Sequence, residues 1–235
     1  MYKFDDFWLD GESACSLGIR LQKEITFSAP SPRVESISIP GRSGNLLIPD
    51  GSFENVVGTA ECFCTDKNVT AVMTAVNAWL MRSVEYRRLE TLNEPDFYRL
   101  ARLTRGAELE PRLNHLNPFT LEFDCKPQKY YKSGEWPLEY TAKNKKLYSP
   151  SPFPALPLIT ITGTGNGTIT INGVVITMSE CNGVTLDCES KEATVNGASV
   201  NSRISGTYPT LGEENTITWS GGITALEIVP RWWTL

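Results

Sequence analysis

The chain has 235 residues, of which 40% are hydrophobic and 21% charged, a balance typical of one large globular domain or two smaller ones. Its formal net charge of −5 argues against a nucleic-acid-binding surface, which is normally basic. The 18 glycines and 15 prolines indicate many turns, and therefore a large share of β structure.

The first 21 residues predict a pair of strands. The aromatic side chains of Phe4, Phe7 and Trp8 precede a turn at Gly11, and apolar side chains then alternate from Cys15 to Leu21. The N-terminus has no continuous apolar segment typical of a secretory signal, and no stretch approaches the roughly 18 apolar residues that span a bilayer. We therefore expect a protein made and kept in the cytoplasm unless another component carries it out, with no membrane insertion.

Residues 36–53 predict an extended hairpin, called the arm below. Isoleucines alternate with serines up to Ile39, and Pro40-Gly41 ends this first strand, because proline lacks an N–H group and glycine accepts turn dihedrals. A polar tip follows, and the turn signal Pro49-Asp50-Gly51 closes a second apolar run. A two-stranded arm is only marginally stable alone in water. We expect it to pack on a neighbour, either in its own sheet or in another subunit.

One convincing helix is predicted over Asn68–Met81. Its apolar side chains recur at helical spacing on one wide stripe, and Asp66 or Asn68 is placed to cap its first turn. The stripe predicts that the helix lies across a sheet. Strong alternation predicts strands over residues 56–64 and 119–125, the second of which completes an N-terminal domain.

Residues 82–105 form the most basic segment, with six arginines interleaved with four carboxylates. Nucleic acid would favour an unbroken basic patch. We therefore expect most of these arginines to face neighbouring subunits or their own acidic partners, and no specific nucleic-acid binding.

The composition divides the chain into residues 1–130, a Pro-rich connector over 131–150, and a last third over 151–235. The last third has no helical periodicity. Its short β-branched runs are separated by glycines and by repeated Asn-Gly pairs, such as Asn172-Gly173, the strongest short hairpin signal. This pattern predicts an antiparallel β-sandwich.

The sequence offers little for catalysis or metal binding. The single histidine, His115, has no serine or cysteine nucleophile nearby in sequence. Carboxylate pairs such as Asp5-Asp6 and Glu213-Glu214 leave a glycosidase dyad open, whereas the glycine run at 162–168 lacks the lysine and helix of a phosphate-binding loop. The six cysteines are expected to be reduced and mostly buried, without the second Cys pair of a zinc site. We expect no cofactor and no metal.

Three stretches in one order resemble the distal tail proteins of long-tailed bacteriophages. The first is the PGR-x-G-x-L arm with its DG-x-F turn; the second is the helix followed by EPDFYR and FDCKP; the third is SPFPALPLITITGTG with the closing PRWW. The resemblance covers nearly the whole chain. It implies a mainly β fold with one main helix, in which a β-rich N-terminal domain carries the arm and a C-terminal domain is a galectin-like antiparallel β-sandwich.

The function that this resemblance implies is structural and not enzymatic. The N-terminal domains would form a ring, six-fold in the family, that joins the tail tube protein to the tail-tip hub, tail-associated lysin or fibre protein, with receptor-binding proteins as further partners. DNA would pass through this ring at the tip of the virion tail. The expected contact between subunits is the arm tip, comprising Ile39, Pro40, Gly41, Arg42, Gly44 and Leu46.

Two other classes of function stay open from the sequence. A carbohydrate-binding module would fit a galectin-like sandwich, with Asn201, Arg203 and stacking on Trp219 as candidates, but the C-terminal domain lacks the histidine of a galectin-type site. A tail-associated hydrolase is disfavoured because no catalytic set is evident.

Overall fold

The computed structural model describes residues 5–64, 68–105, 117–143 and 145–235. The chain divides into two compact units, one ending at Lys129 and the other comprising Tyr130–Thr234. Strands dominate both units, and α1 (Val69–Leu80) is the single α-helix among the described residues. The predicted fold class, mainly β with one main helix, is confirmed.

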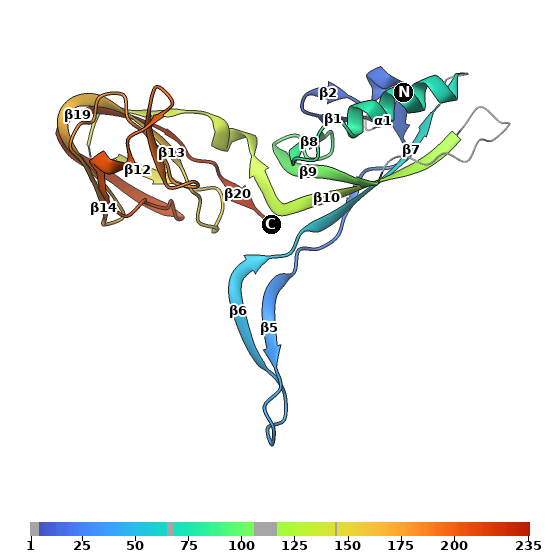
Figure 1. The fold of residues 1–235 in the computed structure, drawn as a ribbon, viewed down its shortest axis with the longest axis horizontal. Coiled ribbons are helices and arrows are strands. Elements are labelled where there is room, and N and C mark those ends of the chain that lie inside the picture. The colour runs from blue at the N-terminus through green and yellow to red at the C-terminus, as the bar shows by residue number, and fades with distance from the viewer. Residues whose placement is uncertain (1–4, 65–67, 106–116, 144) are drawn as a thin grey trace. The chain divides into compact units, whose positions relative to one another are not determined.

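The first unit is built on one antiparallel sheet, with strand order β2-β1-β8-β9-β10-β7-β3 and with β4 also paired to β7 (Figure 1). Its strands are β1 (Phe7–Leu9), β2 (Glu12–Ser13), β3 (Ile19–Leu21), β4 (Thr26–Phe27), β7 (Val56–Cys64), β8 (Arg87–Thr91), β9 (Phe97–Arg105) and β10 (Asn117–Tyr131). A single 3-10 turn, Cys15–Leu17, connects β2 to β3.

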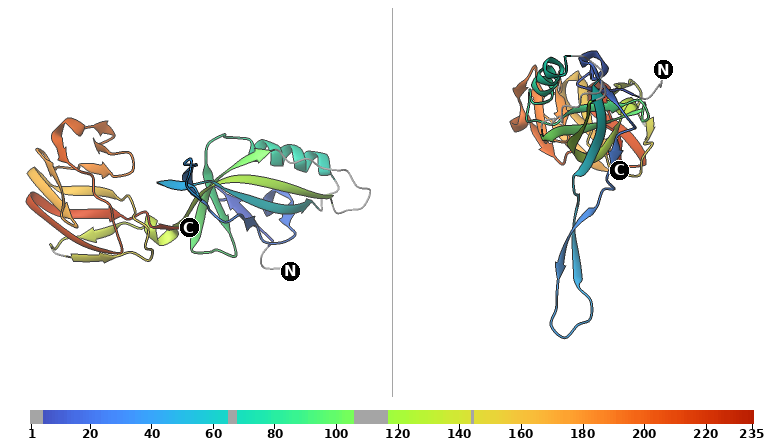
Figure 2. Two further views of the ribbon diagram at one scale, coloured as in Figure 1. Left: turned by 90° about the horizontal axis from the view of Figure 1, so that it is seen from below. Right: turned by 90° about the vertical axis from the view of Figure 1, so that its right-hand side faces the viewer.

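Apolar alternation along β7 and β10 creates the core of the first unit. Every second side chain of β7 from Val56 to Cys64 is buried, and β10 pairs with it in antiparallel register from Asn117 opposite Cys64 to Cys125 opposite Val56. Met73, Val76, Trp79 and Leu80 of α1 pack into the same core, so that the helix lies against the sheet (Figure 2).

The predicted start of the helix is confirmed for one of its two candidate caps. The side-chain oxygen of Asn68 accepts a hydrogen bond from the backbone N–H of Ala71 at 3.2 Å, which satisfies one of the N–H groups that a helix leaves unpaired at its first turn. Asp66, the other candidate, lies outside the described residues.

The second unit is an antiparallel sheet curled around a core of its own, with strand order β11-β19-β13-β15-β16-β17. In addition, β12 pairs with β19, and β14 pairs with both β13 and β18. The strands are β11 (Leu138–Tyr140), β12 (Lys145–Tyr148), β13 (Leu158–Ile171), β14 (Val174–Met178), β15 (Thr185–Asp187), β16 (Glu192–Val195), β17 (Ala198–Ser199), β18 (Ile204–Gly206) and β19 (Glu214–Val229), with 3-10 turns at Lys132–Glu135 and Asn201–Arg203. The short last strand, β20 (Trp233–Thr234), does not belong to this sheet and pairs with β10. This architecture agrees with the predicted β-sandwich.

Residues 131–150 are more than the connector that their prolines favour. β11 pairs with β19 from Leu138 to Tyr140, and β12 pairs with the other end of β19. Tyr140 and Leu147 are buried in the core of the second unit. The sequence does not show these two strands, because their regularity comes from pairing with β19 and not from a local alternating pattern.

The glycine run at 162–168 has a structural role. β13 and β19 stay paired from Leu158 to Ile171, but their register shifts between Thr162 and Gly167, where the two strands bend together. Here the backbones approach closely, since a Cβ added to Gly163 would lie 2.5 Å from the carbonyl oxygen of Gly222. Glycines at such a bend let one long strand pass around the corner of a sandwich.

The Asn-Gly pairs form hairpin turns as predicted at two places. Asn172-Gly173 links Ile171 to its partner Val174, and Asn196-Gly197 links β16 to β17. Both residues of each pair have positive φ, at 52° and 82° and at 50° and 80°, as a type I′ turn requires.

Candidate inter-subunit surface

The arm is a separate two-stranded sheet formed by β5 (Pro32–Ile37) and β6 (Leu46–Phe53), and it leaves the main sheet of the first unit as a long ribbon (Figure 1). Its ladder runs from Ile37 opposite Leu46 to Val34 opposite Pro49. The arm thus begins at Pro32 and not at 36, because Val34 and Glu35 also pair with β6. Ser38 and Ile39, expected in the first strand, belong to the tip.

A tight turn shapes the tip. The backbone N–H of Arg42 donates to the carbonyl oxygen of Ile39 at 3.1 Å, with Pro40 and Gly41 between them and Gly41 at φ 80°. Proline at the second position and a positive φ at the third define a type II turn. The turn holds one apolar and one cationic residue at its two ends.

The turn signal at Asp50-Gly51 does not end the second strand, which corrects the expected boundary. Pro32 pairs with Phe53 and Val34 with Pro49, so three residues of β6 oppose Arg33 in a bulge. The Oδ1 atom of Asp50 accepts hydrogen bonds from the N–H and the hydroxyl of Ser52, both at 2.8 Å. These two bonds lower the pKa of Asp50 below its usual value.

All of β5 and the part of β6 from Leu46 to Gly51 are exposed, in contrast to the half-buried strand that alternation predicts. Five large apolar side chains have exposed fractions from 36% to 59%, namely Val34, Ile37, Leu46, Leu47 and Ile48. Exposed apolar side chains gathered in this way mark an interaction surface.

A hollow of about 430 Å³ lies at the root of the arm. It is lined by Arg33, Val34, Glu35, Ile48, Pro49, Asp50 and Glu54. Sequence reasoning missed it because the carboxylates come from three separate places, namely Glu35 in β5, Asp50 in the bulge of β6 and Glu54 just after β6. The hollow is therefore a product of the register of the arm and not of any local motif.

The six predicted contact residues are all placed in the tip or at the start of β6. Ile39 is half-buried, whereas Pro40, Gly41, Arg42, Gly44 and Leu46 are exposed. The structure brings them together on one hairpin, and an inter-subunit role for them remains a proposal.

A polar cluster lies where the arm joins the main sheet. Asn55 Nδ2 donates to the Tyr86 hydroxyl at 2.6 Å and to Asp124 Oδ1 at 2.8 Å, and that hydroxyl and Arg102 Nε each donate to Asp124 Oδ2 at 2.9 Å. Asn55 lies between β6 and β7, so the cluster fastens the chain at the base of the arm. Partial burial alone would raise the pKa of Asp124, but hydrogen bonds from Arg102, Asn55 and Tyr86 lower it.

We expect this cluster to make the first unit sensitive to acid. A carboxylate whose pKa is lowered by folding stabilises the protein above its unfolded pKa of about 3.9, and this stabilisation disappears as the pH falls through the lower folded value. Asp124→Asn should therefore reduce stability by about 1 kcal/mol at pH 6. The measurement is the unfolding temperature of both proteins at pH 6 and pH 3. A difference that stayed constant between these pH values would contradict the assignment.

Five of the six arginines in the 82–105 segment have acidic partners within the described part of the chain. Arg82, Arg87, Arg88, Arg99 and Arg102 each form an ion pair with an acidic residue, at 3.3, 2.7, 2.6, 3.7 and 2.9 Å. Arg99 also stacks on Phe27, with its guanidinium carbon 4.1 Å from the ring centroid. The expectation that these arginines have acidic partners of their own is confirmed for the five whose side chains the structure describes.

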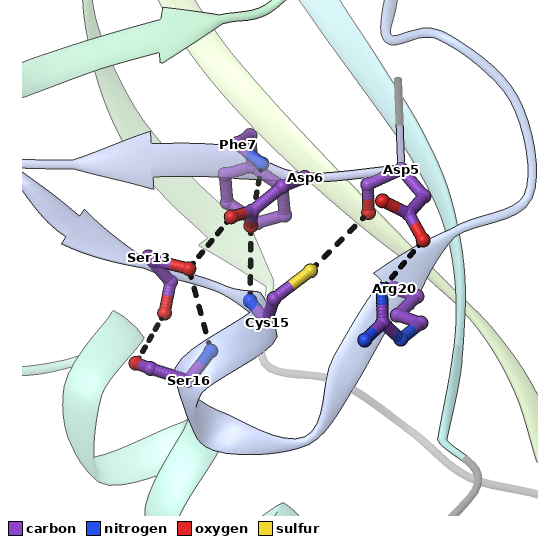
Figure 3. Close-up of polar contacts among 7 residues, drawn as sticks. All are labelled: Asp5, Asp6, Phe7, Ser13, Cys15, Ser16 and Arg20. Carbon is purple, nitrogen blue, oxygen red and sulfur yellow. Dashed lines mark hydrogen bonds and ion pairs between the residues drawn. The ribbon is translucent and has the colours of Figure 1, made fainter. Parts of the chain in front are cut away.

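The candidate carboxylate pairs serve local structure. Asp6 accepts hydrogen bonds from the Ser13 hydroxyl at 2.6 Å and from the backbone N–H of Cys15 at 2.9 Å, while Asp5 pairs with Arg20 (Figure 3). Desolvation and the Asp6 charge raise the pKa of the Cys15 thiol to about 12, so the thiolate needed for nucleophilic attack is scarce. Glu214 pairs with Lys146.

The remaining chemical candidates are placed as follows. All six cysteines are free and five are buried, as expected. Among the described residues no group of three His, Cys, Asp or Glu side chains is arranged to hold a metal ion, and no described helix could cross a membrane. His115 lies outside the described residues.

The three sugar-binding candidates do not share one exposed surface, because Trp219 is buried. Trp219 is only 5% exposed and packs in the core of the second unit, which corrects the idea that it could stack on a sugar. Asn201 uses its side-chain oxygen to accept a 2.6 Å hydrogen bond from the backbone of Ala193. Arg203 is exposed.

Comparison with known proteins identifies the fold. No family model matches the chain, and no curated protein sequence matches it. The fold is that of a hub protein from the adsorption apparatus of a bacteriophage tail. One similar solved structure is SPP1 Dit (gp 19.1), described as a paradigm of the hub adsorption apparatus in phages that infect Gram-positive bacteria, with a TM-score of 0.77 and 14% identity over 99% of this chain and 100% of that one. The resemblance to distal tail proteins is thus confirmed at the level of the fold.

Proposed function

We propose that the chain is a structural protein of a bacteriophage tail tip. Its copies form a ring, six-fold as in the distal tail family, that joins the tail tube to the adsorption apparatus. Its neighbours are the tail tube protein on one side and the tail-tip hub, lysin or fibre protein on the other, with receptor-binding proteins as further partners. The fold match to SPP1 Dit supports this class of function.

The exposed arm is the observation that carries the proposal. Its five exposed apolar side chains pack against neither core of the chain. Burying a large apolar side chain contributes roughly 1.5–3 kcal/mol, so covering this surface would stabilise an assembly considerably. A contact of an arm with a different patch on the next copy is heterologous, and repeated contacts of this kind close into a ring when the rotation permits.

Deleting Arg42–Asn45 should leave a folded monomer and abolish the ring. A sharper variant is Leu47→Asp, because Leu47 is exposed in the arm and its replacement should not disturb either core. Light scattering would give the molar mass, which for the wild type should reach six times the 26.1 kDa of one chain.

The matched control is Val175→Asp, since Val175 is a similarly exposed apolar residue of β14 in the second unit. This control should assemble like the wild type, and all variants should keep the wild-type unfolding temperature. A Leu47→Asp protein with the mass of the wild-type ring would show that the arm is only a local hairpin.

A ring that carries DNA must let the duplex pass without holding it. A net charge of −5 for each chain and the paired arginines of the 82–105 segment suit this requirement. We infer that acidic and neutral side chains line the bore and that no specific nucleic-acid binding occurs. Salt-sensitive micromolar binding of short duplex DNA to the ring, lost on reversing the charge of Arg102, would contradict this inference.

A further inference from the structure

The hollow at the root of the arm combines an apolar wall with an excess of negative charge. Val34, Ile48 and Pro49 supply the apolar side chains. Three carboxylates, on Glu35, Asp50 and Glu54, stand against the single cation of Arg33. Such a surface fits a partner group that presents an apolar and a cationic side chain together.

Two of these carboxylates are held in place by neighbouring side chains. Asp50 accepts both hydrogen bonds of Ser52, and Glu54 Oε2 accepts a 3.0 Å hydrogen bond from the Ser31 hydroxyl. Groups that are already fixed lose little conformational freedom when a partner binds. The hollow is therefore preorganised for a cation.

The arm tip has the complementary chemistry. Arg42 is the sole charged residue between positions 36 and 49, and it is exposed without a carboxylate partner in the described part of the chain. The type II turn places Ile39 three residues before it, joined by the backbone hydrogen bond. The tip thus offers one apolar and one cationic side chain on a rigid turn.

We propose that this hollow receives the arm tip of a second copy of the chain, with Arg42 facing the carboxylates and Ile39 facing the apolar wall. The tip cannot enter the hollow of its own arm, because the paired strands from Val34 to Ile37 hold the two at least roughly 10 Å apart, at about 3.3 Å per residue. Tip and hollow are different surfaces, so the contact is heterologous and propagates from copy to copy. This inference rests on the proposed function and names the surface that receives the arm.

Charge reversal of both partners tests the contact in the full-length protein. The tip variant carries Arg42→Glu, and the hollow variant carries Glu35→Arg together with Glu54→Arg. Each alone sets like charges against each other at every contact and should raise the concentration needed for assembly at least tenfold. The two variants mixed in equal amounts should assemble again. In a ring in which they alternate, each charge-reversed tip meets a charge-reversed hollow, and each native tip meets a native hollow.

The matched control is Arg203→Glu, which changes the charge equally at an exposed arginine of the second unit and should assemble normally. Light scattering gives the molar mass of each variant and of the mixture. Assembly of both variants at wild-type concentrations, or failure of the mixture to assemble, overturns the tip-to-hollow contact while the ring of the proposed function stands. A wild-type protein that stays monomeric at every concentration overturns the self-assembled ring itself, and this inference with it.

Discussion

Replacing Gly222 with alanine should strongly destabilise the second unit while the first unit keeps its stability. A Cβ built on Gly222 would lie 1.6 Å from the carbonyl oxygen of Thr164, a backbone atom that no side-chain rotation can move aside. The bend that β13 and β19 share would have to open, at a cost of about 3 kcal/mol or more. The measurement is thermal unfolding followed by circular dichroism, in which one of two transitions should shift to much lower temperature.

Gly212→Ala is the matched control for this substitution. Gly212 has no heavy atom within 4 Å of its added Cβ, and its φ is not positive, so alanine fits there without strain. The Gly222→Ala protein should also keep the wild-type molar mass, since the arm belongs to the first unit. A small shift shared by both transitions would contradict the independence of the two units.

The second large effect is expected at Asn215, which is completely buried. Its side-chain oxygen accepts hydrogen bonds from Asn172 Nδ2 and from the backbone N–H of Gly212, both at 2.8 Å. Its amide nitrogen donates to the carbonyl oxygens of Leu147 at 3.0 Å and Gly212 at 2.9 Å. One side chain therefore joins β12, the Asn172-Gly173 turn and the loop that precedes β19.

Asn215→Ala leaves all four partner groups without this side chain. Each buried polar group left unpaired costs about 1–3 kcal/mol, so the free energy of unfolding of the second unit should fall by about 3 kcal/mol or more. Denaturant titration of the full-length protein measures this loss. Asn182→Ala, at an exposed asparagine, should change stability by less than about 0.5 kcal/mol. Similar losses in the two variants would rule out the buried network as the cause.

The features predicted correctly from sequence are those that short segments determine. The helix needs only its apolar stripe and Asn68, and the Asn-Gly hairpins need only two adjacent residues with positive φ. The arm was recognisable because Pro40-Gly41 interrupts two apolar runs. Each of these signals lies within a few residues of the structure that it forms.

The features that sequence reasoning missed depend on distant partners. Arg87 finds its carboxylate on Asp10, 77 positions earlier in the chain. β11 and β12 are strands because β19 offers them pairing partners. Trp219 is a core residue because the face of β19 that carries its side chain is turned toward the core of the second unit. The hollow of the arm depends on the bulge at Asp50. The Asp50-Gly51 turn signal forms this bulge within β6 and does not end the strand.

The exposure of the arm also has a consequence for contacts between separate copies of the chain. Both of its strands have an unpaired edge and apolar side chains, the combination that promotes aggregation into extended sheets. Pro32 and Pro49 lie within these strands and lack the N–H group that a growing sheet requires, while Arg33 and Glu35 add charge beside them. These residues are placed as gatekeepers against pairing of the arm edges between copies. Replacing both prolines would remove that protection while leaving the apolar face unchanged.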